Sequence, residues 1–89
     1  MPYYVYIIQS ETDRSYYKGF TENPVLRLQH HNNGDSTYTR SKKPWKLVYV
    51  EECSEKSVAL KRERNLKKIG GERLDALLIH PKNIVSQFL

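Results

Sequence analysis

The sequence predicts a small α+β domain in which a three-stranded antiparallel sheet is flanked by helices. Three short runs rich in tyrosine, valine and isoleucine predict the strands. Two longer segments carry apolar residues at helical spacing between residues that favour helix ends. With 89 residues, the chain has the length of one domain. We therefore expect a single domain over residues 1–89 with the order strand, strand, helix, strand, helix, helix.

The first two strands are predicted over residues 3–9 and 15–20, joined by a polar turn into an antiparallel hairpin. A tight turn at residues 11–14 places Tyr6 opposite Gly19 and Ile8 opposite Tyr17. Tyr6 and Tyr17 are then diagonal neighbours on one face. Because glycine weakens a strand, Gly19 indicates open space across from Tyr6 that another group approaches closely.

The first helix is expected to follow Asn23, a favourable N-cap residue, with Pro24 in its first turn. The pair Asn33-Gly34 is typical of its end. Residues 35–44 predict a polar, basic loop, and residues 45–51 predict the third strand.

A second helix is expected from a cap at Ser54 to about Ile69, where two glycines follow. A short third helix is predicted over residues 72–79, before Pro81. The tail, residues 80–89, ends in enough apolar residues to pack against the rest of the domain.

The charge balance favours a partner that carries phosphates. Lys and Arg total 15 against 10 Asp and Glu, which gives a net charge of +5. Four bases lie within residues 39–46, and five bases with one acid lie within residues 61–68. Basic surface of this density attracts nucleic acid, although a solvated helix face and a basic loop explain the same pattern.

Other classes of protein find no support in the composition. No apolar run approaches the ~20 residues of a membrane span, and the N-terminus lacks the features of a secretory signal. Cys53 is the only cysteine, so no disulfide within the chain and no cysteine metal cluster is expected. We expect a cytoplasmic protein.

Two positions of the first predicted helix suit phosphate chemistry. Arg27 and His31 are four residues apart and therefore share one face. Arginine neutralises a phosphate, and histidine donates or accepts a proton near neutral pH. A solvated helix face is the simpler explanation of the pair taken alone. His30 points about 100° away on an ideal helix and is expected to be less involved.

Glu63 lies within the apolar arc of the second predicted helix. It is the only acid between Lys56 and Gly71. A carboxylate on a packed face needs a partner, which is either a basic side chain or a metal ion. A salt bridge to Lys67 is the plainer alternative, and Arg62 in the same arc is consistent with long stems reaching solvent.

The loop between the first helix and the third strand carries hydroxyl and basic side chains that suit phosphate or sugar contacts. An exposed loop without a ligand is the alternative. The residues are Tyr38, Thr39, Arg40, Lys42 and Lys43.

Taken in order, these features resemble the GIY-YIG nuclease domain family, in small members related to the N-terminal catalytic domain of the UvrC excinuclease subunit. The first motif corresponds to Tyr4-Val5-Tyr6 and the second to Tyr17-Lys18-Gly19. The stretches RLQHHNNG, YTRSKKPWKLVY and SVALKRERNLKK are similar as well. The resemblance covers residues 3 to about 79. Tyr4 stands where the first motif has glycine, and Lys18 where the second has isoleucine.

The resemblance implies a DNA endonuclease, with a role such as repair or recombination, that uses one divalent metal ion. Mg²⁺ is the expected ion and Mn²⁺ the alternative, with Glu63 as the ligand. Tyr6 would activate the attacking water, and Arg27 would hold the phosphate. Tyr17 and His31 would orient Tyr6 or the water by hydrogen bonds.

Two further consequences of the resemblance concern charge. The cations Arg27 and Lys18 would lower the pKa of Tyr6 toward the phenolate form. DNA contacts are expected from five residues, which are Lys18, Tyr38, Arg40, Lys42 and Lys43.

Other functions remain open at this point. The main alternative is a non-catalytic nucleic-acid-binding module that keeps the fold and its charges, and a structural or protein-interaction domain is the third. Because a single small domain carries no separate targeting module, we expect either low sequence preference or a protein partner that directs it to DNA. The sequence does not predict the oligomeric state.

Overall fold

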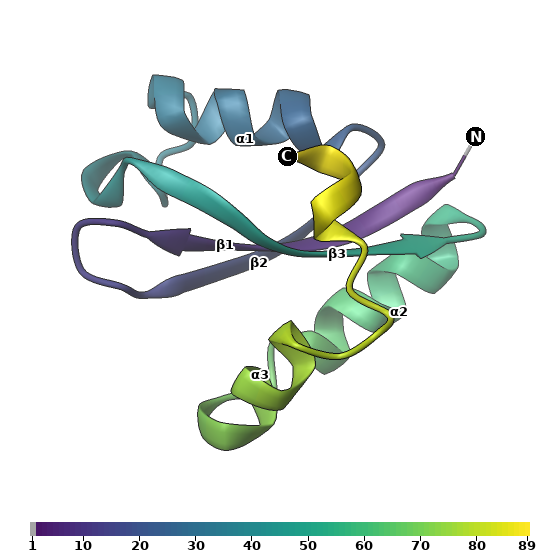
Figure 1. Cartoon of the computed structure of the whole chain (residues 1–89). Coiled ribbons are helices and arrows are strands. Elements are labelled where there is room, and N and C mark those ends of the chain that lie inside the picture. Colours follow the sequence, from purple (N-terminus) through teal and green to yellow (C-terminus); the bar gives the residue numbers. More distant parts are fainter. Residues whose placement is uncertain (1) are drawn as a thin grey trace.

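The computed structural model describes residues 2–89 and shows one open sheet with helices on both of its faces (Figure 1). The three strands are antiparallel in the order β2-β1-β3, so β1 is central. The predicted fold class and element order are confirmed. The elements are β1 (Tyr3–Ser10), β2 (Tyr16–Thr21), α1 (Pro24–Asn33), η1 (Arg40–Lys42), β3 (Trp45–Cys53), α2 (Lys56–Leu66), α3 (Gly71–Leu78) and η2 (Val85–Phe88).

The hairpin of β1 and β2 has the predicted register. Tyr6 pairs with Gly19, and Ile8 pairs with Tyr17. The turn is closed by the Ser10 side chain, whose Oγ accepts hydrogen bonds from the backbone N–H groups of Thr12 (3.0 Å) and Asp13 (3.2 Å). These contacts fix which residues of β1 and β2 face each other.

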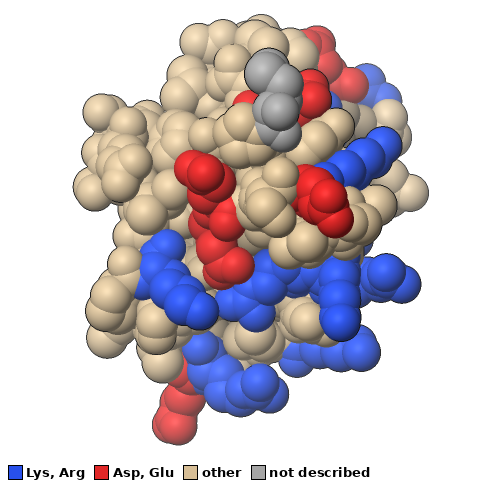
Figure 2. Space-filling view, turned by 90° about the vertical axis from the view of Figure 1, so that its right-hand side faces the viewer, with Lys and Arg blue, Asp and Glu red and all other residues tan. Residues whose placement is uncertain are grey.

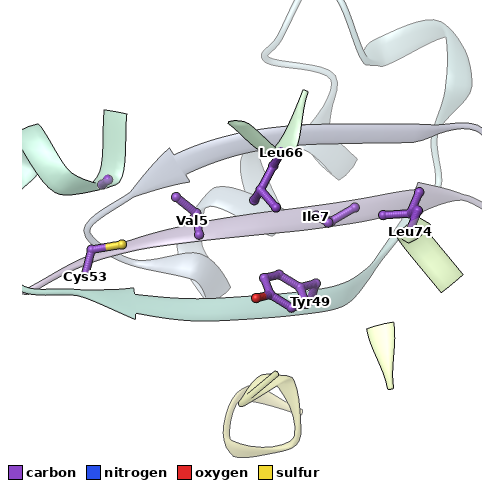
Figure 3. Close-up of a cluster of buried hydrophobic side chains, with 7 residues drawn as sticks. Val5, Ile7, Tyr49, Cys53, Leu66 and Leu74 are labelled. Atoms are coloured by element: carbon purple, nitrogen blue, oxygen red, sulfur yellow. The ribbon is translucent and has the colours of Figure 1, made fainter. Parts of the chain in front are cut away.

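Alternate residues of β1 enter two separate cores, one on each face of the sheet. Val5 and Ile7 face α2 and α3, where Figure 3 shows them beside Tyr49, Leu66 and Leu74. Tyr6 and Ile8 point to the opposite face, beneath α1 and the C-terminal tail. Because both faces are covered, all four of these β1 side chains are at most 1% exposed.

Helix α1 has the predicted ends. The Asn23 side chain accepts a hydrogen bond from the Leu26 backbone N–H (3.1 Å) and caps the helix start. Gly34 follows the last residue with φ of 84°, a left-handed conformation that glycine adopts without steric cost. The cap contacts are local, which is why the sequence predicts both ends.

Helix α2 differs from its predicted bounds at both ends. It begins at Lys56 after Glu55, so the expected cap at Ser54 was wrong. It ends at Leu66 rather than near Ile69, because the chain turns there and the Ile69 N–H bonds to the Leu66 carbonyl (3.0 Å). The Lys18 ammonium on β2 donates to the Ile69 carbonyl (2.6 Å) and holds this turn against the sheet.

The arginine in the apolar arc of α2 has a partner on the sheet. The Arg62 Nε–H lies 3.1 Å from both carboxylate oxygens of Glu51, and Glu51 also accepts a hydrogen bond from the Tyr49 hydroxyl. A half-buried guanidinium needs such a partner to offset its lost hydration. This pair joins α2 to β3.

The tail packs onto the sheet, as its apolar residues predict. Asn83 holds it in place, because its amide group bonds to backbone atoms of Val48, Leu78, Val50 and Val85 at 2.8–3.1 Å. The Ile84 N–H adds a bond to the Val50 carbonyl (2.9 Å). Beyond it, the Phe88 ring meets Tyr4 edge-on, and Figure 1 shows this last turn beside α1.

Among residues 2–89, no helix combines the length and the apolar character that crossing a membrane requires.

Candidate active site

The Tyr6 ring fills the space across from Gly19. A Cβ built on Gly19 would lie only 2.7 Å from the Tyr6 Oη. The close approach predicted at Gly19 is therefore made by Tyr6 itself, and the space expected to be open is occupied by the phenol. Tyr6 is 1% exposed, so its hydroxyl depends on protein partners.

Those partners come from α1 and from the loop that follows it. The Tyr6 Oη lies 2.9 Å from the His31 Nε2, and the Arg27 Nε–H donates to the same oxygen at 3.4 Å. On the other side of the imidazole, Nδ1 lies 2.8 Å from the Thr39 Oγ1. Arg27 and His31 share a face of α1 as their spacing predicts, and this face meets the sheet.

Tyr17 completes the wall of the site by ring packing. Its ring centroid lies 5.1 Å from that of His31 and 6.4 Å from that of Tyr6. We expected Tyr17 to orient Tyr6 or the attacking water by a hydrogen bond. In the described residues the Tyr6 hydroxyl bonds to His31 and Arg27, and a hydrogen bond from Tyr17 to the water stays a prediction.

The arginine links the buried phenol to the surface. Its hydrogen bond to Tyr6 raises the pKa of the Arg27 guanidinium, and the hydroxyl of Tyr17 adds to this effect. Arg27 also lines a surface hollow of about 220 Å³ at the start of α1, together with Asn23, Leu26 and His30. The guanidinium has N–H groups that Tyr6 does not use and that can donate to an anion, whereas the carboxylate of Glu22, which also lines the hollow, repels one.

Burial controls the protonation of both central residues. It raises the pKa of Tyr6 to about 12, although Arg27 acts in the opposite direction. Arg27 lowers this pKa as expected, but desolvation outweighs it in the protein alone, and Lys18 contributes nothing because it points to the opposite face. Burial also lowers the pKa of His31 to about 4, so the imidazole is neutral at pH 7.

Glu63 lies on α2, the helix that covers the other face of the sheet from α1. Its side chain is 15% exposed, and its carboxylate lies 3.5 Å from the Lys67 ammonium. Its negative charge adds to the raised pKa of Tyr6, but less than burial and Tyr17 do. The salt bridge expected as the plainer alternative is present, and it leaves one carboxylate oxygen without that partner.

Glu63 suits a hard divalent cation that needs few protein ligands. In the described part of the chain, no three His, Cys, Asp or Glu residues gather in a way that would hold a metal ion. A site at Glu63 would thus offer fewer than three such ligands. Mg²⁺ accepts this because it keeps several waters and takes phosphate oxygens from the substrate.

The five residues predicted to contact DNA do not gather at the phenol. The Lys18 ammonium is bound to the Ile69 carbonyl on the opposite face. Lys42 lies 3.4 Å from Asp13 beside the hairpin turn, and Tyr38 is 85% exposed. Arg40 and Lys43 are exposed in and after η1. Their role in DNA binding stays a prediction.

A second basic surface lies on α2. Figure 2 views the molecule from the side on which α2 lies and shows Lys and Arg side chains gathered in the lower half, with several Asp and Glu side chains above them. The exposed bases of α2 and the turn after it are Lys56, Lys61, Arg64, Lys67 and Lys68.

Thr39 was predicted only as a hydroxyl of the basic loop. Its hydrogen bond to the His31 imidazole was not predicted. Thr39 is 1% exposed, and its carbonyl accepts a hydrogen bond from the Trp45 Nε1–H (2.9 Å). This contact folds the loop back over α1. A threonine eight residues beyond a histidine follows no periodic pattern, so no signal in the sequence marks it.

Comparison with known proteins agrees with this arrangement. The family profile described as the GIY-YIG catalytic domain matches residues 2–73. A UPF0213 protein from Syntrophus aciditrophicus (strain SB) is 39% identical over 84 residues, which cover 91% of this chain and 95% of that protein. A UPF0213 protein from Clostridium perfringens (strain 13 / Type A) is 45% identical over 67 residues, covering 74% of this chain and 71% of that protein.

A solved structure supports the fold. The solution NMR structure of a UPF0213 protein from Bacillus halodurans has a TM-score of 0.59 and 27% sequence identity to this chain. The alignment covers 99% of this chain and 94% of that one.

Proposed function

Because this chain belongs to the GIY-YIG catalytic domain family, a nuclease family, we propose that it is a divalent-metal-dependent endonuclease that hydrolyses phosphodiester bonds in DNA. The observation that carries the proposal is the buried Tyr6 hydroxyl, which is bonded to both His31 and Arg27. A tyrosine that only fills the core needs no such pair of a cation and an imidazole.

In this mechanism Tyr6 acts as the base. Its phenolate takes a proton from the attacking water and becomes a phenol again. The water oxygen forms the new bond to phosphorus, the bond between phosphorus and the leaving oxygen breaks, and the leaving oxygen takes a proton from solvent. At a pKa of about 12 the phenolate is rare at pH 7, at a cost of roughly 7 kcal/mol. The phenol proton must therefore leave to solvent in the substrate complex, where further positive charge favours the phenolate.

Arg27 and Glu63 supply the electrostatic part. Arg27 donates through Nε to Tyr6 and keeps its terminal N–H groups for the phosphate. Glu63 would hold the divalent cation, which when bound supplies positive charge for the phosphate and the leaving oxygen. Neutral His31 keeps the Tyr6 oxygen in one position.

The exposed basic face of α2 suits the backbone of the same substrate. Lys61 and Arg64 are three residues apart and therefore share one side of α2, and Lys68 follows in the turn after the helix. All three side chains are exposed and can reach phosphates of a DNA backbone. Lys67, in the same turn, is bound to Glu63.

Cleavage assays test the catalytic proposal. Branched, damaged and plain duplex DNA are incubated with Mg²⁺ or Mn²⁺, and with EDTA as the metal-free control. We expect metal-dependent cutting that falls by at least about 100-fold in Tyr6→Phe and Glu63→Gln. Tyr16→Phe is the matched control, because Tyr16 packs against the opposite core. A preference for branched or damaged DNA would support a role in repair or recombination.

The outcomes separate the competing functions. Undiminished cutting in both site variants would overturn the assignment of Tyr6 and Glu63. Tight binding without cutting would support a non-catalytic nucleic-acid-binding module, and neither binding nor cutting would support a protein-interaction domain.

Salt dependence tests the DNA-binding face separately. In EDTA, the slope of log Kd against log salt concentration should fall by about 2 to 3 when Lys61, Arg64 and Lys68 are all changed to Gln, because each lost phosphate contact removes about 0.9. A control with the same charge change alters Lys46, Arg73 and Lys82, which are exposed elsewhere. Equal slopes in the two triple variants would refute this face.

A further inference from the structure

Two hydrogen bonds join the side chains of Thr39, His31 and Tyr6 in a row. The hydrogen atoms that these three side chains can donate exceed the bonds in the row by one. His31 is neutral, so the row holds one Thr O–H, one ring N–H and one Tyr O–H. It contains only two hydrogen bonds, Thr39 Oγ1 to Nδ1 and Nε2 to Tyr6 Oη. One terminal hydroxyl hydrogen is therefore left without an acceptor in the row, and its position depends on the tautomer of His31.

The two hydroxyl groups at the ends of the row differ in whether they can give up the hydrogen that has no acceptor. Among the described residues, His31 Nδ1 is the hydrogen-bond partner of the Thr39 hydroxyl, and Thr39 is 1% exposed. An aliphatic alcohol cannot lose its proton in water, so a Thr39 O–H that points away from Nδ1 stays buried and unpaired. The Tyr6 hydroxyl is equally buried, but a phenol can lose its proton, as the proposed catalytic step requires. Once Tyr6 does so, two hydrogens match two hydrogen bonds.

We infer that Thr39 is a positioning residue that sets the tautomer of His31. Its O–H donates to Nδ1, the ring hydrogen is therefore on Nε2, and the Nε2–H donates to the Tyr6 oxygen. Arg27 Nε–H donates to the same oxygen. Two N–H groups thus converge on an atom whose negative form they favour over its neutral form.

The opposite tautomer would reverse the role of the histidine. A hydrogen on Nδ1 would donate to Thr39, and Nε2 would accept the Tyr6 O–H. That arrangement stabilises the phenol and resists its deprotonation. By excluding it, Thr39 prepares Tyr6 to serve as a base without touching the substrate. The inference rests on the proposed function, because the loss of the Tyr6 proton that selects this tautomer belongs to the proposed catalytic step.

Nitrogen NMR of the imidazole tests the inference directly. In ¹⁵N-labelled wild-type protein, the His31 signals should show a hydrogen on Nε2 and a bare Nδ1. Thr39→Val keeps the shape of the side chain but removes the donor, so the ring should become a mixture of tautomers or change to Nδ1–H. Thr39→Ser keeps the hydroxyl and should keep the wild-type signals. A wild-type ring with its hydrogen on Nδ1 overturns the inference, even if Thr39→Val does not fold.

Two further measurements connect the tautomer to Tyr6. The pKa of Tyr6, followed by ¹³C labelling of its Cζ, should be higher in Thr39→Val than in the wild type and in Thr39→Ser. If the wild type cleaves DNA, kcat should fall by about 10- to 100-fold in Thr39→Val, with KM unchanged, and recover in Thr39→Ser. An unchanged Tyr6 pKa and kcat in Thr39→Val would refute the positioning role.

These results distinguish this inference from the proposed function. An Nε2–H tautomer that depends on Thr39, in a protein that does not cut DNA, supports the inference and contradicts the endonuclease. DNA cleavage by a protein with an Nδ1–H tautomer supports the endonuclease and contradicts the inference.

Discussion

Replacing Gly19 by alanine would test the contact on which the site depends. The added Cβ would lie 2.7 Å from the Tyr6 Oη and 2.8 Å from its Cζ, whereas ordinary contact begins at 3.4 Å. The ring has to retreat by about 0.7 Å to relieve this overlap. A shift of that size would take the 2.9 Å Tyr6–His31 contact outside the range of hydrogen-bond distances.

The expected cost has two parts. Overpacking a buried ring costs about 1–3 kcal/mol, and a lost buried hydrogen bond adds about 1 kcal/mol. We therefore expect Gly19→Ala to lower the free energy of unfolding by about 2–4 kcal/mol and to slow cleavage by about 100-fold. Were the space open, the same change would stabilise the strand by about 0.5–1 kcal/mol, so the two explanations predict opposite signs.

Urea unfolding followed by circular dichroism measures the stability, and a second background isolates the cause. Leucine at position 6 lacks the Cζ and Oη atoms that lie nearest to the new methyl group. In Tyr6→Leu protein, Gly19→Ala should therefore cost nothing or be slightly stabilising. A gain in stability in the wild-type background, or the same loss in both backgrounds, would refute the reasoning.

Two further predictions concern stability. Burial holds the pKa of His31 near 4, against an ordinary value of 6.5, so stability from the neutral ring is complete above pH 6.5 and declines as the pH falls toward 4. The loss is at most about 3 kcal/mol. The free energy of unfolding, measured in urea across this pH range, should depend less on pH in His31→Gln than in the wild type. An equal pH dependence in both proteins would contradict this assignment. Asn83→Ala removes four hydrogen bonds and should lower the free energy of unfolding by about 2–4 kcal/mol in the same assay. Asn83→Asp should lie between this variant and the wild type. A loss under about 0.5 kcal/mol would show that the contacts of the tail contribute little to stability.

The parts of the fold that depend on neighbouring residues were predictable from the sequence. The hairpin register follows from a short polar turn between two apolar runs, and it correctly pairs Tyr6 with Gly19. Both ends of α1 follow from Asn23 and Gly34, whose capping contacts are local. The i, i+4 spacing of Arg27 and His31 placed both on the face of α1 that meets Tyr6.

Features that depend on distant contacts were not predictable. The end of α2 is set by Leu66 and by Lys18, which is on a strand far earlier in the chain. The contact between Thr39 and His31 needs the loop to fold back over α1. The pKa of Tyr6 follows mainly from its burial in the packed structure, which outweighs the effect of Arg27 and cannot be read from the spacing of cations in the sequence.

The attachment of the tail has a consequence for association between chains. β3 is an outer strand of the sheet, and Asn83 and Ile84 bind the backbone groups of Val48 and Val50. If the tail were removed, these groups would form an open edge able to pair with a strand of another molecule. Tyr4 would lose its Phe88 neighbour at the same time. A chain that ends before residue 83 should therefore aggregate by edge-to-edge strand addition, even though every residue of the site beside Tyr6 is still present.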